Sequence, residues 1–189
     1  FPGLPIVLGG IEASLRRISH YDFWSDSLRR SLLLDAKADL LVYGMGEAPL
    51  LALAYLAREM ARGGREISGP ALSAAASGAP GLARIISVAE AEKYRGEAVN
   101  LPGHEEMLAE PALLLAATLD LERQVHQGRA FALQAAGGRH ILLHPPAPGL
   151  SCAEMDFLYG LPVTRQSHPT YSEPVPAAER YADLGVDDG

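Results

Sequence analysis

Two short apolar runs, each ending in a glycine turn, most constrain how this chain can fold. Pro5–Leu8 (PIVL) precedes Gly9-Gly10, and Ala38–Tyr43 (ADLLVY) precedes the GMGE turn of Gly44–Glu47. Apolar runs without polar alternation are typical of strands that are buried on both faces of a sheet. The chain between them is long enough to hold a helix. We therefore expect two parallel neighbouring strands, with both glycine turns at the same edge of the sheet.

This edge is where an open α/β sheet binds ligands, because a crevice forms outside the carboxyl ends of its strands. Glycine permits tight turns and close approach of the backbone to a ligand. The glycines alone are a weak signal, because GMGE does not complete a dinucleotide fingerprint and the sequence contains no GxxxxGK[ST] phosphate loop. Glu12 and Glu47 follow the two turns. Each either accepts hydrogen bonds from ligand hydroxyls or lies at the amino end of a helix, where a carboxylate is favourable.

The segment between the two strands is predicted to be helical in two places. Ile11–Ile18 fits a short helix. Asp22 or Ser25 is placed to cap a second helix over Asp26–Lys37, whose apolar stripe contains Leu28, Leu32 and Leu33.

After the second glycine turn, the predicted elements alternate between helices and short strands. Helices are predicted over Pro49–Ala61, Ala112–Gln127 and, after a capping box at Ser151–Glu154, Ala153–Tyr159. VNLPGHEEM (residues 99–107) is predicted to be an extended segment that turns into a helix. Strands are predicted at Arg84–Val88, Ala130–Gln134 and His140–Leu143, the last two forming a hairpin around Gly137-Gly138.

Charged and aromatic residues are densest at residues 16–26, between the two apolar strands. One interpretation is a solvated loop in which Arg and Asp pair locally and the aromatic rings pack onto the sheet. The other is a ligand-binding or docking surface, because loops at the carboxyl ends of strands often carry function. The candidate residues from this loop and the glycine turns are Gly9, Gly10, Glu12, Arg16, Arg17, His20, Asp22, Trp24, Gly44, Gly46 and Glu47.

Composition excludes several classes of partner. The 189 residues carry a net charge of −7, so non-specific nucleic-acid binding is not expected. No apolar run approaches the ~20 residues that a membrane-spanning helix needs, so no membrane partner is expected. The chain opens close to a strand, without an initiator Met or a signal peptide. We therefore expect that strands upstream of Pro5 are missing and that the sheet is incomplete on its amino-terminal side.

Cysteine and histidine usage argues against a metal site on this chain. Cys152 is the sole cysteine, so an internal disulfide and a cysteine-ligated zinc or iron–sulfur site are both excluded here. Its place inside the capping box suggests a packing thiol, and a reducing, cytoplasmic location is expected. The spacing of His140, His144 and His168 matches no standard metal-ligand motif.

Five stretches carry a family resemblance: residues 9–30 (GGIEASLRRISHYDFWSDSLRR), 37–44 (KADLLVYG), 99–107 (VNLPGHEEM), 144–162 (HPPAPGLSCAEMDFLYGLP) and 165–171 (RQSHPTY). Together they resemble the amino-terminal domain of the YgiQ family of radical S-adenosylmethionine (SAM) proteins. The resemblance implies a bacterial protein made of this region, a radical SAM barrel and a carboxyl-terminal extension. The parent would bind a [4Fe–4S] cluster through a CxxxCxxC motif and cleave SAM reductively.

The chain departs from the family pattern at both ends. The upstream strands are absent, and the residues after Tyr171 do not lead into the cysteine motif. No cluster or SAM ligand of the parent therefore maps onto a residue here. The order of strand, glycine turn, helix and strand also resembles the cobalamin-binding domains that precede other radical SAM barrels. The DxHxxG motif that supplies their cobalt ligand is missing, so the fold analogy does not imply cobalamin binding.

The sequence therefore predicts an α/β fold with a Rossmann-like, cobalamin-binding-domain-like parallel sheet and flanking helices. Residues 1–64 form its βαβα portion, residues 65–171 the helical remainder with short strands, and residues 172–189 an extended acidic tail. We expect an accessory domain that shapes or covers the substrate side of the radical SAM barrel of the same polypeptide, facing a small-molecule or macromolecular substrate. The alternatives are a module that binds a nucleotide-like or cobalamin-like ligand, and a purely structural domain.

Overall fold

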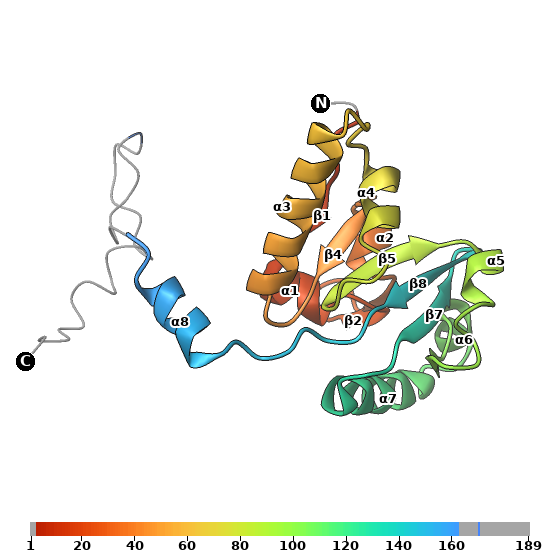
Figure 1. Cartoon of the computed structure of the whole chain (residues 1–189). Coiled ribbons are helices and arrows are strands. Elements are labelled where there is room, and N and C mark those ends of the chain that lie inside the picture. The colour runs from red at the N-terminus through yellow and green to blue at the C-terminus, as the bar shows by residue number, and fades with distance from the viewer. Residues whose placement is uncertain (1–2, 163–169, 171–189) are drawn as a thin grey trace, which may run out of the picture. The chain divides into compact units, whose positions relative to one another are not determined.

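The computed structural model describes residues 3–162 and residue 170. The chain separates into two compact units, residues 1–149 and residues 150–189. The first contains a sheet with helices on both faces (Figure 1), and the helix α8 (Cys152–Tyr159) belongs to the second. The predicted tail at residues 172–189 lies outside the described residues, and the predicted domain boundaries stay predictions.

The first unit is a mixed α/β fold. Its strands are β1 (Val7–Leu8), β2 (His20–Asp22), β3 (Ser27–Arg29), β4 (Leu40–Val42), β5 (Leu82–Ile86), β6 (Val99–Leu101), β7 (Ala132–Ala136) and β8 (Arg139–Leu143). Its helices are α1 (Gly10–Leu15), α2 (Leu32–Asp35), α3 (Glu47–Arg62), α4 (Gly69–Ala75), α5 (Val88–Ala91), α6 (His104–Ala109) and α7 (Leu113–Gln127). No helix of the described chain is both long and apolar enough to cross a membrane.

Six of the described strands form one sheet in the order β1-β4-β5-β8-β7-β6. The predicted parallel pair is confirmed, because Val7 lies opposite Leu40 and Leu8 opposite Leu41. β6 and β7 are also parallel, whereas β4–β5, β5–β8 and β7–β8 are antiparallel. The α/β class with flanking helices is confirmed and is consistent with a Rossmann-like fold, but the sheet is mixed rather than wholly parallel. An apolar run does not encode which neighbour it pairs with.

Alternation along β4 and β5 divides the core between two helical layers, since successive strand residues face opposite sides of a sheet. On one face, Leu40, Val42 and Leu82 pack with residues of α3 and α4. On the other face, Leu41, Tyr43 and Ala83 pack with residues of α1, α2 and α7. Figure 1 shows β4 and β5 between these layers.

The prediction of a helix over Asp26–Lys37 is wrong. β2 and β3 form an antiparallel hairpin in which His20 lies opposite Arg29, and the helix that follows, α2, has only four residues. Asp26, with φ +47°, makes the turn, and Ser25 Oγ donates to Asp22 Oδ2 (2.6 Å). Asp22 and Ser25 therefore stabilise a hairpin turn instead of capping a helix. The N-cap of α2 is Ser31, whose Oγ accepts from Leu33 N (3.2 Å).

Other predicted elements are confirmed to within a few residues. α3 contains Pro49 in its first turn, α7 covers the predicted Ala112–Gln127 helix, and β7 and β8 form the predicted hairpin. β6 and α6 are the predicted extended segment and helix. The capping box of α8 is also confirmed, because Glu154 N donates to Ser151 Oγ (3.3 Å) and Ser151 N donates to Glu154 Oε2 (2.8 Å).

Candidate functional site at the carboxyl ends of β1 and β4

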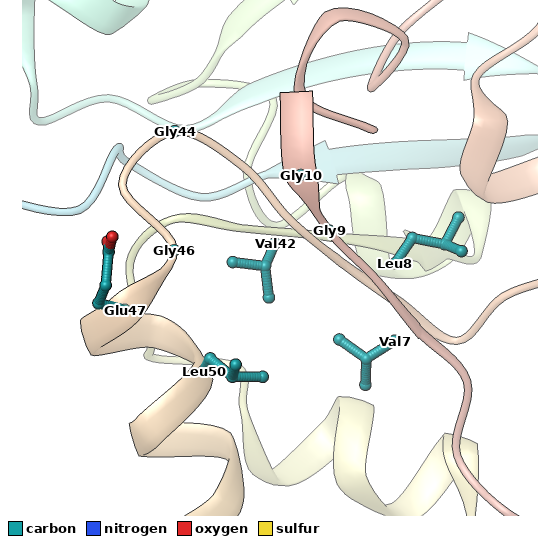
Figure 2. A pocket seen from close by; sticks show the side chains of 9 residues that line it. All are labelled: Val7, Leu8, Gly9, Gly10, Val42, Gly44, Gly46, Glu47 and Leu50. Carbon is teal, nitrogen blue, oxygen red and sulfur yellow. The ribbon is translucent and has the colours of Figure 1, made fainter. Parts of the chain in front are cut away.

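The two glycine turns share one open pocket, which confirms that they lie at the same edge of the sheet. Its volume is about 500 Å³. Figure 2 shows the turn after β1 and the turn after β4 on either side of this space. The lining residues are Val7, Leu8, Gly9, Gly10, Val42, Gly44, Gly46, Glu47 and Leu50. Five of the eleven predicted site residues are therefore brought together here.

Gly10 and Gly44 are required by the backbone. Their φ angles are +88° and +70°, in the left-handed region that residues other than glycine rarely adopt. A Cβ added at either position would meet no atom within 4 Å, so the space above both turns is open. The glycines thus leave the backbone accessible from the pocket.

Ser14 joins the two turns, a role that no sequence motif predicted. Its Oγ donates to the carbonyl oxygen of Gly10 (2.9 Å) and accepts from Gly44 N (3.1 Å). Ser14 lies on α1, one turn after Gly10, so its hydroxyl reaches its own helix start and the neighbouring loop together. This bridge fixes the spacing of the two sides of the pocket.

The pocket is apolar at its base and carries one carboxylate. In Figure 2, the side chains of Val7, Val42 and Leu50 point into the same space, and Leu8 points away from it. Glu47 is the sole ionisable side chain of the described lining, at the first residue of α3. Such a surface suits an apolar ring or chain whose hydroxyl or amine groups reach Glu47 and the glycine backbone.

Arg16 ties the end of α1 to the β2–β3 hairpin. Its Nη1 lies 3.1 Å from Glu12 Oε1 and its Nη2 lies 3.9 Å from Asp22 Oδ1. The Ser25 hydroxyl that donates to Asp22 lowers the pKa of this carboxyl, and the Trp24 backbone and Arg16 lower it further. The local Arg–Asp pairing expected from the sequence is present. Glu12 is engaged with Arg16 and is absent from the described pocket lining.

Arg17 and His20 pack toward the protein instead of facing the pocket. The Arg17 guanidinium lies over the Tyr43 ring, 4.9 Å from its centroid, and its Nη1 donates to the carbonyl oxygen of Ser14. Burial lowers the pKa of Arg17. His20 is half-buried with Nδ1 3.2 Å from the carbonyl oxygen of Ile18, and burial is the main cause of its lowered pKa. Arg17 therefore packs between α1 and the end of β4, and His20 contacts the backbone just before β2.

Trp24 does not pack onto the sheet, so an aromatic staple at this residue is wrong. Its side chain is 82% exposed and lies against Phe23, with 4.6 Å between ring centroids. On the adjoining helix α1, Ile11 is 81% exposed and Leu15 is 70% exposed. The Arg16–Asp22 contact joins these two elements. We call Ile11, Leu15, Arg16, Asp22, Phe23 and Trp24 the hairpin surface.

A buried polar network behind the hairpin was not predicted. Ser19 Oγ lies 3.1 Å from His104 Nδ1 and donates to Gln134 Oε1 (3.0 Å), which also accepts from Ser19 N (2.8 Å). Gln134 Nε2 donates to the carbonyl oxygen of Pro102 (3.1 Å). These groups are 7% exposed or less, and they link the start of the hairpin to β7 and α6. Ser19 lies 85 residues from His104 and 115 residues from Gln134 in the sequence, so no local pattern reveals these contacts.

The sequence of the chain matches a known family. The family described as Radical SAM N-terminal matches residues 1–182, and the chain belongs to it. This confirms the resemblance drawn from the motifs.

The curated relatives are longer proteins. A UPF0313 protein of Geobacter sulfurreducens is 43% identical over 180 residues, which cover 94% of this chain and 27% of that protein. A UPF0313 protein of Methanosarcina mazei is 37% identical over 204 residues, covering 95% of this chain and 32% of that protein. The chain thus spans about a quarter to a third of the length of these relatives. No solved structure matches it significantly.

The residues of this chain do not fit an iron–sulfur cluster. A [4Fe–4S] cluster is held by several cysteine thiolates, whereas the sequence has one cysteine. Cys152 is exposed on α8. No group of three or more His, Cys, Asp and Glu side chains within residues 3–162 is arranged to hold a metal ion.

Proposed function

We propose that this chain is the accessory amino-terminal domain of a radical SAM iron–sulfur enzyme, and that it shapes or covers the substrate side of the barrel. The family match and the greater length of the relatives support this role. The [4Fe–4S] cluster and SAM would then be held by another part of the polypeptide, because this chain offers a single thiolate. A lone cysteine suits a reducing compartment, so we assign the enzyme to the cytoplasm.

The observation that carries the proposal is the hairpin surface. Phe23 and Trp24 are 66% and 82% exposed, and they directly follow Asp22, the Arg16 partner, in a hairpin whose turn is fixed by side-chain hydrogen bonds. Tyr, Trp and Arg are enriched among the residues that dominate binding energy, and a preorganised segment loses less entropy when it docks. Contiguous exposed apolar surface usually marks an interaction site.

The occupant that we propose for the hairpin surface is the barrel domain of the same polypeptide. Roughly 70% of the length of the relatives lies outside the matched region, so they contain enough further chain to cover this surface. The hairpin surface adjoins the pocket through α1, whose first residue, Gly10, lines that pocket. Docking at this edge would place the glycine turns toward the barrel, at the side where a substrate enters.

A double substitution in the full-length enzyme tests the docking role. Phe23→Ala with Trp24→Ala removes the exposed pair, and we expect reductive SAM cleavage to fall about tenfold or more, as for loss of a dominant interface contact. The matched control is Leu115→Ala with Leu119→Ala on α7, two side chains that are 67% and 48% exposed. Production of 5′-deoxyadenosine measures turnover, and a circular dichroism melt checks folding. Equal losses in the two double variants would contradict the proposal.

The pocket itself favours a second candidate, a small-ligand module. A cavity of about 500 Å³ with an apolar base and an accessible glycine backbone fits a nucleotide-like group, whereas a cobalamin-like group would place only one edge in it. A ligand that binds only the folded state raises the melting temperature as its concentration exceeds Kd. Adenosine, SAM and cobalamin are the probes, with Ser14→Ala as the variant that loosens the pocket. A shift with one probe that Ser14→Ala reduces would favour this candidate, and unchanged melting with all three would exclude them as its ligands.

A further inference from the structure

A second pocket, of about 630 Å³, lies at the opposite end of β4 from the glycine turns. It opens where α2 leads into β4 and where α4, β5 and β8 reach the same end of the sheet. Its lining residues are Arg30, Leu34, Lys37, Ala38, Asp39, Gly69, Pro70, Ser73, Ile85 and Arg139. No sequence motif pointed to a function at this end of the sheet.

Three cationic side chains line this pocket in a chain whose net charge is −7. Arg30 is partly neutralised, because its Nε and Nη2 donate to Asp35 Oδ1 (3.1 and 2.8 Å). Lys37 and Arg139 make no ion pair and no side-chain hydrogen bond within the described chain. Like charges that converge on one space repel each other, so their arrangement favours an anion between them.

The lining contains one carboxylate, Asp39, which lowers the net positive charge of the pocket but forms no ion pair with any of these three cations in the described chain. Asp39 Oδ2 accepts from Ile6 N (2.8 Å), which fixes the start of β1 against β4. The other oxygen, Oδ1, is pressed against Gly69, where an added Cβ would lie 1.9 Å from it. Asp39 is therefore held by the backbone at the wall of the pocket, and Lys37 and Arg139 remain without an anionic partner in the described residues.

We propose that this pocket binds a small anionic ligand through its phosphate or carboxylate group. Arg139 offers a guanidinium fork that matches the geometry of either oxyanion, and Lys37 adds a point charge. Ser73 places a hydroxyl in the same lining as a further donor, and Arg30 adds a second guanidinium. Leu34 and Ile85 provide an apolar wall for the carbon part of the ligand. The pocket is large enough for a small organic phosphate or carboxylate.

Calorimetric titration of the whole chain at constant ionic strength tests this proposal. The probes are inorganic phosphate, glycerol 3-phosphate and succinate, which distinguish the phosphate from the carboxylate. We expect saturable binding of at least one probe, weakened roughly tenfold by Arg139→Ala, the change expected when a charge-assisted hydrogen bond is lost. Lys37→Asn is a second variant, because Lys37 has φ +53° and Asn tolerates that conformation.

The matched control is Arg65→Ala, which removes the same charge from an exposed arginine outside the pocket. Arg65 makes no ion pair within the described chain. Unchanged affinity in Arg65→Ala, with weaker binding in both pocket variants, supports the proposal. Absence of saturable binding for all three probes, or an equal loss in Arg65→Ala, would overturn it.

Discussion

Two clusters in this chain use arginine, carboxylate and aromatic side chains in opposite ways. In the buried cluster, Arg84 is 5% exposed, and its Nη2 donates to Glu90 Oε1 (2.7 Å) and to the Tyr94 hydroxyl (3.3 Å). On the hairpin surface, Arg16 is partly exposed and lies 3.1 Å from the exposed Glu12 carboxylate and 3.9 Å from the more covered Asp22 carboxylate. Burial makes the first arrangement a requirement of the fold and leaves the second free for contacts with a partner.

The buried cluster also fixes the state of a histidine. Arg84 Nε donates to His144 Nε2 (3.3 Å), so the ring proton resides on Nδ1, which donates to the carbonyl oxygen of Ala79 (2.7 Å). Burial lowers the pKa of His144 to about 4, so the ring is neutral at pH 7. The cluster joins β5 to the region of α5 and to the chain that leaves β8. Polar groups therefore hold the sheet to its helical layer at this point.

The largest difference between the two clusters is expected on removal of an arginine. Arg84→Ala removes the donor of the buried His144 ring and the cation that pairs with the partly exposed Glu90, and we expect a loss of about 3 kcal/mol in the free energy of unfolding. Urea denaturation measures it, with Arg16→Ala as the exposed counterpart. A loss below about 1 kcal/mol for Arg84→Ala would show that the buried cluster is not needed for stability.

The second test uses pH. As pH falls from 6.5 toward 4, the unfolded chain binds a proton at residue 144 that the folded chain does not bind. The stability present above pH 6.5 is therefore lost in this window, by roughly 3 kcal/mol at pH 4, since each pKa unit is worth about 1.4 kcal/mol. His144→Gln retains a donor and an acceptor and should flatten this part of the profile. If the unsubstituted chain and His144→Gln showed the same dependence of unfolding free energy on pH, the lowered pKa would not belong to His144.

Hydrogen bonds lower the pKa values of Asp22, Glu105 and Glu154. The stability that these carboxylates contribute to the folded chain is also lost as pH falls, but only below their ordinary pKa values. His20 contributes in the same direction as His144. These four groups remain in His144→Gln. The difference between the two profiles therefore isolates residue 144.

The smallest effects are expected on the hairpin surface. Trp24→Ala and Arg16→Ala should each change the free energy of unfolding by less than about 0.5 kcal/mol, as for ordinary surface substitutions. Trp24 is 82% exposed and contacts Phe23 instead of the core. Chemical denaturation of the single variants measures this. If either variant lost more than about 1 kcal/mol in the free energy of unfolding, the hairpin surface would be needed for stability, as Arg84 is, and the contrast between the two clusters would fail.

Local patterns determined a large part of this protein. The apolar runs and glycine turns predicted the parallel β1–β4 pair and its pocket, because strand burial and turn geometry are encoded within a few residues. The helices α3 and α7 followed from their periodicity, and α8 followed from its capping box. Five predicted site residues line one pocket, whereas Arg17 packs over Tyr43 and Trp24 lies on the hairpin.

Only the tertiary structure decided the segment between these strands. The spacing of Leu28, Leu32 and Leu33 fits one continuous helix, yet Leu28 lies in β3, and Leu32 and Leu33 open the four-residue helix α2. Ser31 Oγ donates to the carbonyl oxygen of Arg17 (2.7 Å), and Leu32 N donates to that of Arg16 (2.8 Å). These bonds reach back 14 to 16 residues. They outweigh a local helical preference that is worth less than about 1 kcal/mol per residue.

The tertiary structure alone also decided the mixed strand order, the cationic pocket and the partners of Arg84. Arg84 and His144 are 60 residues apart, and Ser19 and Gln134 are 115 apart. A sequence specifies such groups only through the fold that brings them together, because burial turns a polar side chain that would be neutral on the surface into one that requires a partner. Short-range periodicity and turn chemistry are set by adjacent residues, whereas pairing and burial depend on the whole chain.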